Sequence, residues 1–162
     1  MSDTNSTLQR SQTPTVHHTF RIERTYRQSP ARVFGAFQDK SIVRRWRVES
    51  EGCEVLEFNY DFRIGGSEVS RFSFAGGPEI RLDAQFQDIV PEERIVFSYR
   101  MGMGPNPFSV SLTTVEFFPS GEGTSLVFTE QGAFFDGMGA EGREHGCREL
   151  LERLAVELES VN

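Results

Sequence analysis

The stretch at residues 141–158, EGREHGCRELLERLAVEL, decides the fold because it has the periodicity of one long helix. Its apolar residues recur three and four positions apart, so they lie on one stripe of that helix. They are Cys147, Leu150, Leu151, Leu154 and Leu158. Most of the chain before this stretch alternates apolar and polar residues, which is typical of strands. The sequence therefore predicts one long C-terminal helix gripped by one sheet.

Seven strands are predicted ahead of that helix, separated by turns rich in Gly, Pro and Asn. Their ranges are 19–27, 53–62, 69–75, 79–90, 94–101, 108–118 and 124–133. Two short helices follow the first strand, one capped by Ser29 with Pro30 in its first turn, the other capped by Asp39. We therefore expect an α+β domain whose curved antiparallel sheet wraps on the C-terminal helix and leaves a cavity beneath it.

The composition of the 162 residues limits the possible functions. Residues 18–160 are expected to form a single domain, and the polar segment 1–17 a disordered tail. A net charge of −7 argues against nucleic-acid binding. Cys53 and Cys147 lie far apart and suggest reduced thiols in the cytoplasm. The chain has no apolar run long enough for a membrane span, so no membrane association is expected.

Five short motifs follow one another in a recognisable order: Ser29-Pro30-Ala31-Arg32-Val33-Phe34, Val43-Arg44-Arg45-Trp46, Asp61-Phe62-Arg63-Ile64-Gly65-Gly66, Pro91-Glu92-Glu93-Arg94-Ile95-Val96-Phe97 and Gly123-Thr124-Ser125-Leu126. Together they resemble the START-like helix-grip superfamily, also called birch-pollen-allergen-like or SRPBCC. Within it, the chain is most similar to the activator-of-Hsp-ATPase-like family of small bacterial proteins. The resemblance covers residues 19–158 and implies the helix-grip fold.

Three positions depart from that family's pattern. Relatives often have Trp where this chain has Arg47, Trp where it has Cys147, and His where it has Glu130. A cysteine in place of a bulky ring leaves room at the N-terminal end of the last helix. Each departure argues against copying a ligand from any one relative.

The leading hypothesis is binding of a small hydrophobic or aromatic molecule, or a lipid, in the cavity, with no cofactor. Aromatic residues of the strands and short helices would line it: Phe37, Trp46, Phe58, Phe72, Phe74, Phe86, Phe97, Tyr99 and Phe128. The long helix would contribute Cys147, Leu150 and Leu151.

An enzyme is the alternative, since the resemblance implies relatives among polyketide cyclases, aromatases and hydrolase-like proteins. Strand alternation predicts that Tyr99, Glu116 and Glu130 point inward. A carboxyl group buried among Phe rings has a raised pKa and can serve as an acid or base. Glu130 with Tyr99 is the first candidate pair, and His145 near the cavity mouth is the third candidate.

Two further expectations concern partners and metals. A chaperone-associated role ranks last, because true co-chaperones of this resemblance carry an additional N-terminal domain. Homodimerisation through open sheet edges is a possible assembly. No metal site is expected, because two of the three histidines are the adjacent His17 and His18, which point to opposite sides of a strand.

Overall fold

The structure is a computed structural model that describes residues 14–135 and 139–160, and its centre is one seven-stranded antiparallel sheet. The strands are β1 (Val16–Tyr26), β2 (Cys53–Tyr60), β3 (Ser67–Phe74), β4 (Ile80–Val90), β5 (Arg94–Met103), β6 (Asn106–Ser120) and β7 (Gly123–Phe134). Their order across the sheet is β1-β7-β6-β5-β4-β3-β2, so β2 to β7 form a meander and β1 pairs with its last strand.

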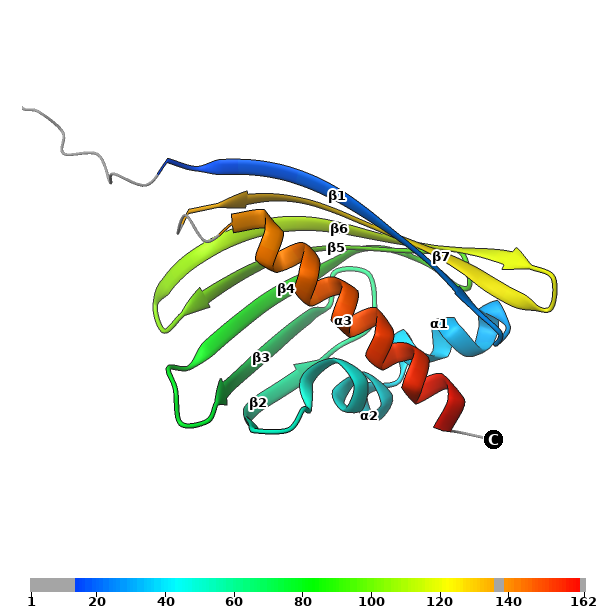
Figure 1. The fold of residues 1–162 in the computed structure, drawn as a ribbon, viewed down its shortest axis with the longest axis horizontal. Helices are drawn as coiled ribbons and strands as arrows, with labels where there is room; N and C mark the ends of the chain where they lie inside the picture. Colours follow the sequence, from blue (N-terminus) through cyan, green and yellow to red (C-terminus); the bar gives the residue numbers. More distant parts are fainter. Residues whose placement is uncertain (1–13, 136–138, 161–162) are drawn as a thin grey trace, which may run out of the picture.

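The long helix α3 (Gly139–Ser160) lies diagonally across one side of the curved sheet (Figure 1). Two short helices, α1 (Pro30–Gln38) and α2 (Lys40–Val43), and the π-helical turn η1 (Arg44–Val48) connect β1 to β2. They lie beside the C-terminal half of α3 (Figure 1). The predicted helix-grip α+β architecture is confirmed.

The first strand begins earlier than predicted. β1 starts at Val16, so His17 and His18 lie within the sheet and not in a tail. Residues 1–13 of the predicted tail lie outside the described residues. Because side chains alternate along a strand, the two histidines point to opposite faces of the sheet, as predicted.

Local side-chain contacts explain the short helices. Ser29 Oγ accepts a hydrogen bond from the backbone N–H of Arg32 at 3.3 Å, and Pro30 occupies the first turn of α1. Asp39 Oδ1 caps α2 by accepting from the N–H groups of Ser41 and Ile42 at 2.9 and 3.1 Å. Both caps were predicted from the sequence, and each satisfies backbone donors that the helix itself leaves free.

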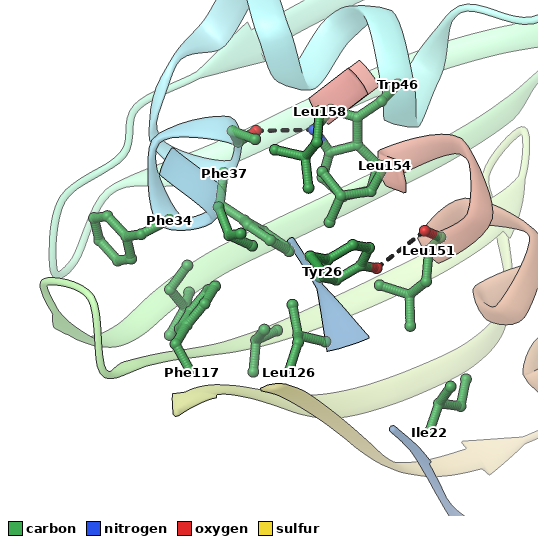
Figure 2. Packing of buried hydrophobic residues seen from close by; sticks show 14 of the residues in the cluster. Ile22, Tyr26, Phe34, Phe37, Trp46, Phe117, Leu126, Leu151, Leu154 and Leu158 are labelled. Atoms are coloured by element: carbon green, nitrogen blue, oxygen red, sulfur yellow. Dashed lines mark hydrogen bonds between the residues drawn. The ribbon is translucent and has the colours of Figure 1, made fainter. Parts of the chain in front are cut away.

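The core lies between the C-terminal half of α3, the helix α1 and one end of the sheet (Figure 2). Leu151, Leu154 and Leu158 are almost fully buried there. Tyr26 donates its hydroxyl hydrogen to the carbonyl oxygen of Leu151 at 3.0 Å, and Trp46 Nε1 donates to that of Ala36 at 2.8 Å (Figure 2). The predicted apolar stripe of α3 is therefore the buried stripe, with Leu150 half-buried at its edge.

The Gly65-Gly66 turn joins β2 to β3 and is tied to β4. Gly65 has φ +82°, and a Cβ at Gly66 would overlap the carbonyl oxygen of Asp61. Gly65 N–H donates to Phe86 O at 2.8 Å, and Phe86 N–H donates to Gly66 O at 2.9 Å. These bonds hold the middle of β4 against the turn, so the motif acts as a structural joint.

Candidate ligand-binding site

Polar side chains gather in the middle of the face of the sheet that α3 crosses. The register aligns Tyr99 with Ser111, and Thr113 with Glu130. Ser109 precedes Ser111 by two residues on β6 and therefore lies on the same face of the sheet. Ser109, Ser111, Thr113 and Glu130 are each no more than 3% exposed. We call Tyr99, Ser109, Ser111, Thr113 and Glu130 the polar belt.

Apolar rows lie on both sides of the polar belt. On the side toward the core, Ile95, Val115 and Phe128 pair across β5, β6 and β7. On the other side, Leu82 pairs with Met101, and both are only half-buried. The polar belt therefore separates a closed apolar core from a partly accessible apolar zone.

Arg143, from the second turn of α3, reaches the polar belt with its guanidinium group. Its Nη1 donates to Tyr99 Oη at 2.7 Å and lies 3.3 Å from Glu130 Oε2, and its Nη2 donates to Ser109 Oγ at 2.6 Å. The guanidinium carbon lies 5.3 Å from the ring centre of Tyr99 and 5.2 Å from that of Phe134. The side chain of Arg143 is 13% exposed, so this ion pair is largely shielded from water.

The carboxylate of Glu130 is held by four groups. Tyr99 Oη donates to Oε1 at 2.8 Å, and Thr113 Oγ1 donates to the same oxygen at 3.2 Å. Cys147 Sγ lies 3.9 Å from Oε1, and Arg143 holds Oε2. Glu130 is thus a fixed hydrogen-bond acceptor at the centre of the network.

Burial and neighbouring charges shift the pKa values of Tyr99, Arg143 and Cys147. Burial raises the pKa of Tyr99 well above its usual value, and the nearby Glu130 raises it further. Burial alone would lower the pKa of Arg143, but Tyr99 and Glu130 together raise it more, so the guanidinium stays charged. Burial, followed by the charge of Glu130, raises the pKa of Cys147, which keeps its thiol neutral.

We expect the two cysteines to differ in reactivity. The thiolate is the reactive form, and Cys147 is buried with a raised pKa, whereas Cys53 is only half-buried. Iodoacetamide at pH 8 should label Cys53 in the folded protein and Cys147 only after denaturation, as mass spectrometry of the peptides would show. A Cys147→Ser variant provides the matched control for assigning the slow site. Equal labelling of both in the folded protein would contradict the buried placement of Cys147.

A second buried ion pair lies on the same face. Arg47 pairs with Glu68, whose Oε2 also accepts from Ser70 Oγ at 2.7 Å. The guanidinium of Arg47 lies 5.6 Å from the ring centre of Tyr60. Burial alone would lower the pKa of Arg47, but Glu68 and then Tyr60 raise it more. Glu68 pairs with Ala84, and Ala84 with Tyr99, which places this pair beside the polar belt.

The catalytic candidates separate into two groups. Tyr99 and Glu130 meet, as described above. Glu116 does not point inward, because Val115 and Phe117 are the buried residues of β6 and Glu116 alternates with them. His145, predicted near the cavity mouth, has a side chain that is 76% exposed on α3 and pairs with Glu149 at 3.0 Å, and not with Tyr99 or Glu130.

The residues predicted to line the cavity fall into several environments. Phe37, Trp46, Phe86 and Leu151 are packed inside the core. Phe58 belongs to a small separate cluster with Val43 and Val48. Phe97, Phe128 and Leu150 are half-buried against the core, Phe72 is half-buried on β3, and Cys147 touches Glu130. Phe74, at the end of β3, shares the phase of Phe72 and packs against its ring, but its side chain is 51% exposed.

Side chains therefore fill much of the space where the sequence predicted a cavity. Two surface hollows lie elsewhere on the molecule. One, of about 800 Å³, lies between the start of α1, the β4–β5 turn and residues Glu116–Pro119. The other, of about 360 Å³, is lined by the Glu79–Asp83 and Arg100–Pro107 regions. Neither is lined by any of the residues predicted to bind ligand.

The sequence missed six polar members of the site: the charged residues Arg47, Glu68 and Arg143, and the hydroxyl residues Ser109, Ser111 and Thr113. Arg143 lies four residues before Cys147, hence on the same side of α3, and that spacing could have identified it. Glu68 shares the phase of Ser70 and Phe72 on β3. In residues 14–135 and 139–160, no group of three or more His, Cys, Asp or Glu side chains could hold a metal ion. No helix in these ranges is long and apolar enough to cross a membrane.

Comparison with known proteins places these features in context. The family model of Activator of Hsp90 ATPase homolog 1-like proteins matches residues 27–159. The Mll3558 protein from Rhizobium loti shares 68% identity and a TM-score of 0.83, over 89% of this chain and 99% of that one. An uncharacterized protein from Rhizobium leguminosarum shares 37% identity and a TM-score of 0.87, over 91% and 98% of the two chains. No curated protein matches the chain.

A more distant similarity concerns the fold alone. An AHSA1-like protein from Aeromonas hydrophila is 18% identical, with a TM-score of 0.69 over 88% of this chain and 93% of that one. At this identity the two chains share the helix-grip architecture, and individual residues of the site are not transferred between them.

Proposed function

This chain belongs to the Activator of Hsp90 ATPase homolog 1-like protein family, and from that premise we propose that it binds a small, largely hydrophobic or aromatic molecule on the concave face of its sheet. The observation that carries this proposal is the polar belt with Arg143, buried between two apolar zones. A buried ion pair is costly to desolvate, and well-packed apolar residues are often as stable in its place. A buried polar network that the fold does not need for its stability is a candidate site for recognising a ligand.

The apolar zone beside the polar belt is the place that we propose for the apolar body of the ligand. Leu82 and Met101 pair across β4 and β5, and Phe72 lies on the same face of β3. All three are half-buried, whereas the apolar residues beneath the C-terminal half of α3 are closed off. We place the apolar body over these three residues and the polar group of the ligand at Arg143 and the serines of the polar belt.

A thermal-shift series tests this function. The probes are 4-alkylbenzenes, methyl to hexyl, that carry a carboxamide, a carboxylate or an aminomethyl group. We expect at least one series to raise the Tm saturably, with a larger shift for longer alkyl groups. Leu82→Gln should weaken the effect, whereas Leu112→Gln, on the opposite face of the sheet and 39% exposed, should leave it unchanged. Failure of all three series to stabilise the wild-type protein would reject the proposal.

The hydrogen bonds that Glu130 already makes favour binding over acid–base catalysis. A catalytic acid or base must exchange a proton with a substrate within hydrogen-bond reach. Both oxygens of Glu130 already accept from protein donors, and Tyr99 gives its hydroxyl hydrogen to that carboxylate. We therefore infer that Glu130 and Tyr99 position Arg143, and that recognition is the function of the network.

A further inference from the structure

The buried charges of the concave face are balanced in pairs. Arg143 with Glu130, and Arg47 with Glu68, each bring one positive and one negative group together. The carboxylates are 1% and 2% exposed and the arginines 13% and 18%. In such a shielded place each pair is neutral as a unit, and an added charge would have no free counter-charge.

Arg143 has little capacity left for an anion. Arg143 already contacts Tyr99, Ser109, Ser111 and Glu130. An entering carboxylate would have to take Arg143 from Glu130, and Glu130 would then be a buried charge without its cation. Breaking a buried pair in this way is far more costly than exchanging neutral hydrogen bonds.

Ser109 and Ser111 have the free hydrogen-bond donors that Arg143 lacks. Ser109 and Ser111 accept hydrogen bonds from Arg143 through their oxygens, and each hydroxyl also carries one hydrogen to donate. Within the described residues, neither hydroxyl hydrogen is donated to a protein acceptor. These two hydroxyl hydrogens are therefore available to a ligand group that accepts hydrogen bonds.

We propose that the polar group of the ligand is uncharged and accepts hydrogen bonds, as a carboxamide or ketone does, and that the paired charges of the site exclude carboxylates and ammonium groups. This inference rests on the binding function proposed above. It adds the chemical class of the head group, and it assigns Glu130 and Glu68 the role of cancelling the two arginines.

Isothermal titration calorimetry on the full chain at one pH can compare three probes with one body: 4-butylbenzamide, 4-butylbenzoate and 4-butylbenzylamine. We expect the wild-type protein to bind the amide at least tenfold more tightly than either charged probe. In Glu130→Gln, the amide side chain still accepts hydrogen bonds but no longer balances Arg143. The benzoate should then gain at least tenfold in affinity relative to the amide. Glu116→Gln, which removes a carboxylate from the opposite face, should leave the wild-type preference intact.

Each outcome of this comparison supports or overturns the head-group inference or the binding function. Benzoate binding to the wild-type protein as tightly as the amide would overturn the head-group inference while supporting the binding function. An unchanged preference in a folded Glu130→Gln variant would overturn it as well. Where that variant does not fold, Glu68→Gln tests the same reversal through Arg47. The absence of binding by all three probes and by the alkyl series would reject the binding function itself.

Discussion

Replacing Arg143 with Met is expected to lower the free energy of unfolding by about 3 kcal/mol, because the substitution leaves the carboxylate of Glu130 buried without its cation. Glu130→Leu should cost a similar amount for the converse reason. The double variant, however, removes both charges and fills the site with apolar groups. We expect it to be more stable than the sum of the single effects implies, by about 2 kcal/mol or more.

These four proteins, the wild type, the two single variants and the double variant, form a double-mutant cycle. Urea unfolding followed by circular dichroism measures the free energy of unfolding of each. The matched control is the pair Arg21–Glu23, whose side chains are 61% and 65% exposed. Arg21→Met should change the stability by less than about 0.5 kcal/mol, since exposed ion pairs contribute little. Strict additivity of Arg143→Met and Glu130→Leu would show that the two side chains do not act as a pair.

The cycle also bears on why the network exists. If the double variant folds stably yet no longer gains Tm with the alkylbenzene probes, then the ion pair serves recognition and the fold does not depend on it. If instead the double variant is far less stable than the wild-type protein, then the polar belt is a structural element of this sheet. The two results lead to different explanations of the same contacts.

The fold was predictable because its signals are local. The stripe of α3 needs only the spacing of Leu151, Leu154 and Leu158, and the caps need only Ser29 and Asp39 at the right distance from an apolar run. Periodicity and capping act within one or two turns of the chain. The meander of β2 to β7 agrees with the short connections between those strands, whereas no short connection indicates the pairing of β1 with β7.

The site was predictable only in part, because it depends on the phase and register of several strands. Glu130 and Tyr99 were placed together by alternation, but the same argument failed for Glu116, since a phase error of one residue moves a side chain to the other face. Arg47 lies within the π-helical turn η1, where the wider turn places side chains at other phases than an α-helix would. The contact of Arg143 with Ser109 joins residues 34 positions apart, and no local pattern reports such a pairing.

Leu154→Ala is expected to have the other large effect on stability, a loss of about 3 kcal/mol. Leu154 is fully buried in the core that α3 forms with the sheet and α1 (Figure 2), so truncation leaves a cavity in a closely packed place. Val156 provides a matched control, because it lies on the same helix two residues later and is 71% exposed. Val156→Ala should change the stability by less than about 0.5 kcal/mol.

The comparison of Leu154→Ala with Arg143→Met separates the two halves of α3. The C-terminal half packs against Tyr26 and Trp46, whereas the N-terminal half meets the polar belt through Arg143 and Cys147. At a temperature where both variants are folded, Leu154→Ala should therefore bind the amide probe with wild-type affinity, and Arg143→Met should bind it at least tenfold more weakly. A loss of affinity in Leu154→Ala equal to that in Arg143→Met would mean that the ligand reaches into the core, as the wider cavity predicted from the sequence requires.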